Sequence, residues 1–166
     1  MTSMGNAVRA VLLVGALLLT NAAGASAQQI AGPYGAPVTL AQARAIVDAG
    51  HREAKARNFT MAFAVALPSG EPILLEVMDG TQSASIVIAP AKARSSARLR
   101  RSTKVFADGA NGGNLGVTTL DDVVAVEGGV PIVSGGRVIG ALGVSGGTAA
   151  QDGEVAAAAL AAVKLD

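Results

Sequence analysis

The chain has 166 residues, of which 13 are basic and 12 acidic, so its formal net charge is +1. A charge so close to zero argues against general affinity for nucleic acid or anionic lipid. With three Phe, one Tyr and no Trp, aromatic platforms for stacking bases are not expected. The chain contains no Cys, which excludes disulfides, lipid attachment at a cysteine, and thiolate nucleophiles or metal ligands.

The N-terminal segment has the features of a secretory signal peptide. Arg9 precedes an apolar run over residues 10–19, and Ala25-Ser26-Ala27 offers the small residues that signal peptidase reads. This run is about half the length that a membrane-spanning helix needs, although a retained anchor is the alternative. We therefore expect a periplasmic or secreted protein, free of the membrane after cleavage. The expected organisation is a signal peptide at residues 1–27, a flexible leader at 28–37 and one domain at 38–166.

A first helix is predicted from Thr39 to about Arg57. Thr39 and Gln42 form a capping-box pattern, in which the hydroxyl and the side-chain amide satisfy free backbone groups at a helix start. Apolar residues at helical spacing follow. The expected buried stripe consists of Leu40, Ala43, Val47, Gly50 and Ala54.

Residues 59–79 are predicted to form an antiparallel hairpin. Larger apolar residues alternate with small ones over residues 60–67, and the alternation returns at Ile73, Leu75 and Val77 after a Pro-Ser-Gly turn. The second face of the first strand carries only small residues. This pattern suggests that a helix covers that face closely.

A second helix is predicted over residues 83–101. The residues expected on its inner side are Ile86, Ile88, Ala91, Ser95 and Leu99. Pro90 lacks a backbone donor, so it either lies in the first turn of a shorter helix or produces a kink. A glycine-rich loop is expected over residues 108–116, while residues 120–126 stay unassigned between helix and strand.

Residues 128–147 predict two strands joined by a glycine turn at residues 135 and 136, where positive φ angles are tolerated. Gly140 and Gly143 weaken a strand, so close approach of another backbone or a ligand explains them better than propensity. We interpret this segment as scaffold and subunit contact. With a closing helix over residues 152–164, the order of elements favours an α+β domain whose antiparallel sheet has about five strands.

Three sequence blocks together resemble the GlcG/HbpS-like haem-binding family. They are residues 77–80, residues 88–94 with 100–103, and residues 128–147 with Gln151 and Asp152. The resemblance covers about residues 38–163, and Pro90 and the turn at 66–70 depart from the family pattern. It implies a profilin-like fold, homo-oligomers and, for secreted members, haem binding with reported haem degradation. Other members are cytoplasmic or fused to corrinoid-related domains.

Two residues are candidate ligands of haem iron. His51 is the sole histidine, and imidazole is a common axial ligand. Its alternative is a surface histidine paired with Asp48 or Glu53. Thr103 matches a threonine that the resemblance associates with haem iron in secreted members, although a threonine at a helix end commonly serves as a local cap.

Arg100 and Arg101 are candidates for binding the haem propionates, because guanidinium groups hold carboxylates by paired hydrogen bonds. The alternative is a solvated helix face, or an interface that pairs with Asp121 and Asp122 of another subunit. The basic residues of this segment are Lys92, Arg94, Arg98, Arg100, Arg101 and Lys104.

The function expected from these observations is an exported protein that binds haem or a related tetrapyrrole and contributes to haem storage, sensing or degradation. One alternative is an enzyme of peroxide-dependent haem degradation, or of organic-acid or corrinoid-linked metabolism. Another is a structural or signalling oligomer without a ligand. No complete set of acid and base residues is recognisable, so no catalytic residue is nominated and enzymatic activity stays open.

Overall fold

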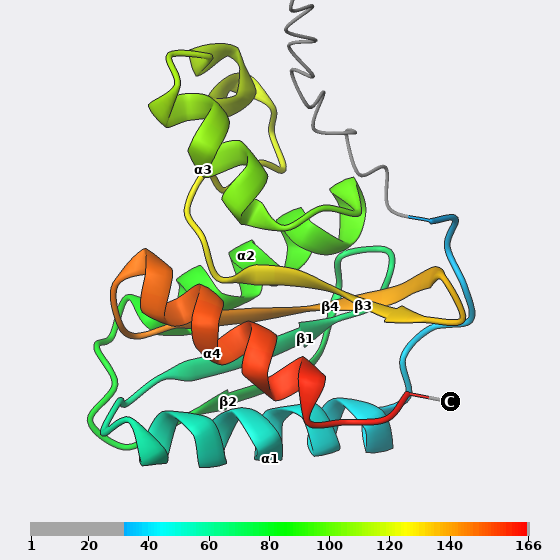
Figure 1. Cartoon of the computed structure of the whole chain (residues 1–166), viewed down its shortest axis with the longest axis vertical. Helices are drawn as coiled ribbons and strands as arrows, with labels where there is room; N and C mark the ends of the chain where they lie inside the picture. The colour runs from blue at the N-terminus through cyan, green and yellow to red at the C-terminus, as the bar shows by residue number, and fades with distance from the viewer. Residues whose placement is uncertain (1–31, 166) are drawn as a thin grey trace, which may run out of the picture.

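The computed structural model describes residues 32–165, whose arrangement is shown in Figure 1. The strand order in the sheet is β2-β1-β4-β3, and every neighbouring pair is antiparallel. The α+β class is confirmed, but the described residues form four strands rather than about five. The elements are α1 (Leu40–Ala56), β1 (Ala62–Ala66), β2 (Pro72–Val77), α2 (Ser85–Leu99), α3 (Thr103–Asn111), the 3₁₀ helix η1 (Leu115–Thr119), β3 (Gly129–Ser134), β4 (Arg137–Ser145) and α4 (Ala149–Ala161).

The expected signal peptide at residues 1–27 lies outside the described residues. None of the helices within residues 32–165 is both long and apolar enough to cross a bilayer.

Helices cover both faces of the sheet, with α1 and α4 on one face and α2 on the other (Figure 1). The first face buries the larger side chains, including Ile46 of α1, Phe63 of β1 and Val155 of α4. The second face is built from alanines, as the small residues of β1 predicted. These alanines are Ala62, Ala64, Ala66 and Ala141 of the sheet and Ala89, Ala93 and Ala97 of α2.

Gly143 of β4 explains how closely α2 approaches the sheet. A Cβ atom at this position would overlap the Ala89 carbonyl oxygen and lie 2.6 Å from the Ala93 backbone nitrogen. The glycine therefore permits contact between a strand and the backbone of a helix, as expected from its cost within a strand.

The predicted capping box of α1 is confirmed, since the Thr39 hydroxyl accepts from the Gln42 amide and the Gln42 side chain accepts from the Thr39 amide. Four residues of the expected stripe are buried, and Ile46 and Ala49 join them. Leu40 was wrongly included: it lies in the first turn and is 39% exposed.

The expected inner face of α2 was largely wrong. Ile86 is 50% exposed and its neighbour Val87 is 66% exposed, whereas Ser95 is buried as expected. Ile86 and Val87 point outward because the closely packed alanine face of the sheet leaves little room for large apolar side chains beneath α2. Pro90 lies inside the helix, beyond its first turn, and its missing N–H leaves the Ile86 carbonyl without its helical donor.

Residues 32–37, which we had placed in a flexible leader, are hydrogen-bonded to the domain. The Gly35 amide donates to the Val138 carbonyl, and the Val138 amide donates to the Pro33 carbonyl. The donor–acceptor distance is 3.0 Å in both hydrogen bonds. The Tyr34 hydroxyl lies 2.8 Å from the Arg98 carbonyl oxygen at the end of α2. The Tyr34 hydroxyl thereby binds a carbonyl that the end of a helix leaves free, and the two backbone bonds pair the segment with β4.

Replacing Tyr34 by Phe is expected to lower the free energy of unfolding by about 1 kcal/mol, the net contribution of a typical hydrogen bond. Urea denaturation of the two proteins measures this difference. An unchanged midpoint would show that water replaces the hydroxyl contact without loss.

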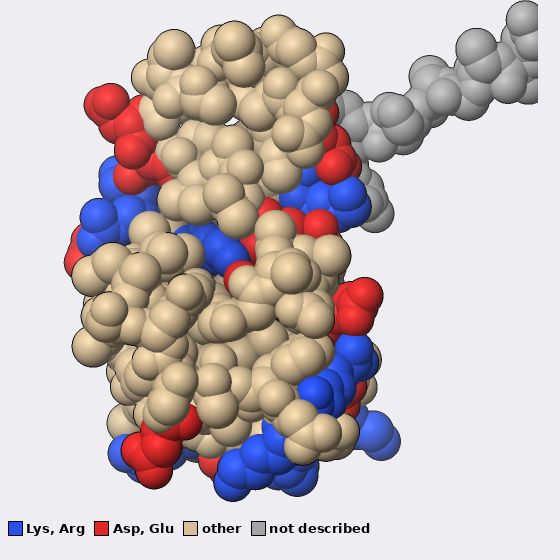
Figure 2. Space-filling model, turned by 90° about the vertical axis from the view of Figure 1, so that its left-hand side faces the viewer, with Lys and Arg blue, Asp and Glu red and all other residues tan. Residues whose placement is uncertain are grey.

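The β3–β4 hairpin is confirmed, and its turn has φ angles of 53° at Gly135 and 73° at Gly136. The expected loop over residues 108–116 is instead helical at both ends, where α3 finishes and η1 begins. These two helices form a lobe at the top of Figure 1, and Figure 2 shows that one side of the lobe is mostly uncharged. Within it Leu115 is 66% exposed.

Candidate functional site

His51 lies on α1 and faces the edge strand β2. Its Nε2 atom is 3.5 Å from Glu76 Oε2, and its ring packs on Phe63 with 5.0 Å between ring centroids. Nε2 is screened from solvent and forms no hydrogen bond within the described part of the chain. Within residues 32–165 the expected partners Asp48 and Glu53 form no ion pair with His51; its acidic partner is Glu76, and Glu53 pairs with Arg57.

A pocket of about 400 Å³ adjoins His51 at the end of β2; we call it the His51 pocket. The protein supplies it with a cation, an anion and an apolar wall together with the imidazole. The lining residues are His51, Lys55, Val77, Met78 and Asp79. Its volume lies within the range of about 300–1,000 Å³ that is usual for small-molecule sites.

Thr103 is remote from His51. It begins α3, is fully buried, and its hydroxyl accepts a hydrogen bond of 2.9 Å from the Gly129 amide of β3. The strands β3 and β2 are opposite edges of the sheet, about 14 Å apart at the usual strand spacing. Thr103 therefore lies at the opposite edge of the sheet from His51, and its buried hydroxyl is already bonded to the Gly129 amide.

Arg100 and Arg101 follow α2, on the other face of the sheet from α1. Arg100 adopts a left-handed backbone conformation with a φ angle of 52°, and its guanidinium carbon lies 5.1 Å from the centroid of the Tyr34 ring. Its guanidinium group also donates a hydrogen bond of 3.3 Å to the Gly32 carbonyl. Arg101 is half-buried and forms no ion pair within residues 32–165.

The remaining basic residues of this segment are not a uniform solvated face. Arg98 pairs with Asp122 of the same chain at 3.0 Å, where we had considered a pairing between subunits. Lys104 pairs with Asp108 at 2.8 Å, which raises the pKa of the exposed lysine through a side-chain hydrogen bond. Arg101 is therefore more available to an anionic ligand than Arg98 or Lys104.

Lys92 forms a buried ion pair that we did not predict. Its Nζ atom lies 2.6 Å from Asp152 Oδ2 and 3.1 Å from the Val144 carbonyl oxygen, and both side chains are under 5% exposed. The pKa of the Asp152 carboxyl is raised, mainly because the group is buried. Hydrogen bonds from Lys92 and from the Gly147 amide act in the opposite direction and offset part of this effect. The pair joins α2 to α4 across the end of β4.

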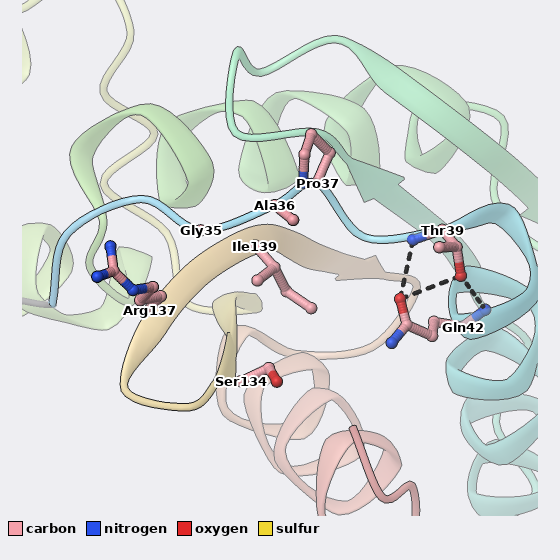
Figure 3. A pocket seen from close by; sticks show the side chains of 8 residues that line it. All are labelled: Gly35, Ala36, Pro37, Thr39, Gln42, Ser134, Arg137 and Ile139. Carbon is pink, nitrogen blue, oxygen red and sulfur yellow. Dashed lines mark hydrogen bonds between the residues drawn. The ribbon is translucent and has the colours of Figure 1, made fainter. Parts of the chain in front are cut away.

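A second pocket, of about 310 Å³, lies between residues 35–37, the β3–β4 hairpin and the start of α1 (Figure 3). Thr39 and Gln42 at its rim are occupied with each other, as the dashed lines in Figure 3 show. The Arg137 guanidinium donates a hydrogen bond of 3.3 Å to the Tyr34 carbonyl. The pocket has no imidazole or carboxylate in its lining, so it offers less chemistry than the His51 pocket.

The described part of the chain offers no site in which several protein side chains together bind a metal ion. Residues 32–165 contain no group of three or more His, Cys, Asp or Glu side chains that could hold a metal ion. A metal at the His51 pocket would therefore have to arrive with most of its ligands already in place, as the iron of a porphyrin does.

The architecture defines a small α+β domain with a lateral pocket, and the comparisons identify its family. Residues 38–161 match the family described as "Haem degrading protein HbpS-like", and the chain belongs to this family. Protein GlcG of Escherichia coli (strain K12) is 41% identical over 103 residues, which cover 62% of this chain and 77% of GlcG.

Solved structures agree with this assignment. The crystal structure of Klebsiella pneumoniae protein ORFY has a TM-score of 0.71 and 30% identity, covering 79% of this chain and 93% of that chain. The crystal structure of a PduOC:heme complex has a TM-score of 0.70 over 76% of this chain and 95% of that chain. At 24% identity, the latter similarity concerns the fold alone.

Proposed function

We propose that this protein binds haem or a closely related metal-containing tetrapyrrole in the His51 pocket. The observation that carries the proposal is the Nε2 atom of His51, an uncommitted nitrogen beside an open pocket in a chain of the HbpS-like family. A buried polar atom without a partner costs free energy, so a ligand that engages it gains accordingly. The haem in the PduOC complex supports the choice of ligand class.

The residues of the pocket fit the parts of such a ligand. His51 would supply a nitrogen to the iron, the apolar side chain of Met78 would contact the macrocycle, and Lys55 would bind a propionate. Haem supplies iron-centred redox chemistry when bound. Lys55 forms no ion pair within residues 32–165, so its charge is available to a carboxylate.

Replacing His51 by Ala is expected to weaken hemin binding at least tenfold and to alter the Soret band of what still binds, because the iron loses its protein nitrogen. Purified protein is titrated with hemin and followed by visible absorption. Arg52→Ala, an exposed neighbour on α1, is the matched control and should bind like the wild type. A wild-type protein that gives no saturable Soret shift would refute the proposed function.

The two residues on the other side of the sheet are tested in the same titration. Thr103→Val removes the hydroxyl, and Arg101→Ala removes a cation that has no acidic partner in the described residues. Both substitutions are expected to leave the Soret maximum of the His51 complex unchanged, because neither residue lies near the pocket. A shifted maximum in Thr103→Val would instead assign the threonine as a donor, as the family resemblance suggested.

We further propose export to the periplasm or the cell exterior, assembly into homo-oligomers, and a role in haem storage, sensing or degradation. The degradation alternative predicts that peroxide bleaches the Soret band faster than it bleaches free hemin, with release of iron. Equal rates would leave binding as the function. The mostly uncharged side of the α3–η1 lobe (Figure 2), together with the exposed apolar residues Val105 and Leu115, supports the oligomer proposal.

A further inference from the structure

Glu76 covers the nitrogen of His51 that the proposed ligand needs. Its Oε2 atom lies 3.5 Å from Nε2, yet the two atoms are not hydrogen-bonded, so the carboxylate shields Nε2 without satisfying it. The His51 side chain is 25% exposed and the Glu76 side chain 40% exposed. An approaching ligand therefore meets the carboxylate together with the imidazole.

His51 is the fixed member of this pair. Its ring packs on Phe63 at an interplanar angle of 40°, and Phe63 is itself fully buried. Phe63 lies so close to α1 that a Cβ atom on Gly50 would be 2.6 Å from its Cε1 atom. The imidazole therefore has little room to turn away from Glu76.

Glu76 is the member that is free to move. It stands opposite Phe63 in the β1–β2 register, so both side chains lie on the same face of the sheet as α1. Its strand, β2, is an edge of the sheet, and among residues 32–165 no other strand flanks its outer side. A rotation of the Glu76 side chain toward solvent exposes Nε2 without disturbing the core.

The charges around the pair favour such a movement. Lys55 and Asp79 line the adjoining pocket, Lys55 from α1 and Asp79 from the segment after β2. Lys55 forms no ion pair in the described part of the chain, so its charge stays available to a carboxylate of the ligand. The negative charge of Asp79 repels the Glu76 carboxylate and disfavours its movement into the pocket, so Glu76 rotates toward solvent.

We infer that Glu76 is a gate for His51: its carboxylate covers Nε2 in the free protein and must rotate away before a ligand reaches that atom. The inference rests on the proposed function for the identity of that ligand. It makes Glu76 a competitor of binding, in contrast to the pocket residues that would hold the ligand.

The proposed gate can be tested without haem, by measuring how fast His51 reacts with diethyl pyrocarbonate. Because the chain has one histidine, the ultraviolet absorbance of carbethoxyhistidine reports on this residue alone when the protein is treated with diethyl pyrocarbonate. Glu76→Ala is expected to react about two- to five-fold faster than the wild type, the factor that corresponds to loss of a partly exposed ion-pair contact. Glu71→Ala, another exposed glutamate, should react at the wild-type rate.

Glu76→Gln separates shape from charge, since it retains the covering side chain and is expected to react more slowly than Glu76→Ala. A Glu76→Ala protein that reacts at the wild-type rate would overturn the inference. So would a Glu76→Ala protein that binds hemin more weakly than the wild type, because a competitor should improve affinity when removed. If the wild type takes up no hemin, the proposed function fails, and the reactivity of His51 still decides whether Glu76 covers it.

Discussion

Lys92→Met is expected to lower the free energy of unfolding by about 3–5 kcal/mol, the effect of removing one partner from a buried ion pair. The substitution keeps the length and most of the apolar stem of the side chain but leaves the Asp152 carboxylate buried without its cationic partner, although the Gly147 amide still donates to it. The Val144 carbonyl also loses the Lys92 donor. Urea denaturation, followed by far-ultraviolet circular dichroism, measures the loss.

The double variant Lys92→Met with Asp152→Leu shows whether the cost comes from the orphaned charge. Its free energy of unfolding should lie above that of Lys92→Met, because no buried charge then lacks a partner. If the double variant is less stable than Lys92→Met, the loss comes from packing around α2 and the explanation by charge is wrong.

Acidic pH should partly rescue Lys92→Met. Burial already raises the pKa of Asp152, and removal of Lys92 takes away an interaction that lowers it. With the folded-state pKa above the unfolded-state value, the folded protein binds more protons between those two values. The deficit of Lys92→Met relative to wild type is therefore full above the folded-state pKa and shrinks as pH falls through this window. A deficit that is independent of pH would argue against a charged Asp152 in the variant.

Local sequence signals predicted much of the scaffold. The capping pattern at Thr39 placed the start of α1, and the glycine pair at 135 and 136 placed the turn of the β3–β4 hairpin. In both places the residues that act on one another are neighbours in the chain. The alanine face of β1 also predicted a closely packed helix, because few other partners fit so flat a surface.

The errors arose where packing overrules the local pattern. In α2 the larger apolar residue Ile86 was expected inside, but the distance between α2 and the sheet is set by Gly143, and serine and alanine fill the space beneath the helix. Residues 32–37 resembled a mobile leader because of their glycines and prolines. They are instead hydrogen-bonded to distant parts of the chain, to β4 through Gly35 and to α2 through the Tyr34 hydroxyl.

The same distinction holds for the candidate site. His51 could be nominated from the sequence because the chain has one histidine, but its partner Glu76 lies on another element and was missed. The pairing of Lys92 with Asp152 was missed for the same reason, although Asp152 lies in the glycine-rich block that carried the family resemblance. Residues that we grouped by function, His51 and Thr103, prove to lie at opposite edges of the sheet.

Gly143→Ala should destabilise the protein by about 3 kcal/mol, at the upper end of the usual cost of overpacking. The added methyl group meets backbone atoms of Ala89 and Ala93 in α2, which cannot rotate away as a side chain would. To accommodate it, α2 would have to move off the sheet, and the contacts of the whole alanine face would loosen together.

Gly109→Ala is the matched control for this prediction. Gly109 lies in α3, and the atom closest to an added Cβ is a Val117 methyl at 3.7 Å, an ordinary van der Waals distance. Its replacement should raise the free energy of unfolding by up to about 1 kcal/mol through helix propensity. Denaturant unfolding of both variants decides the matter: if Gly143→Ala is as stable as wild type, α2 does not rest on the sheet backbone, and the glycine-rich block has another role than close packing.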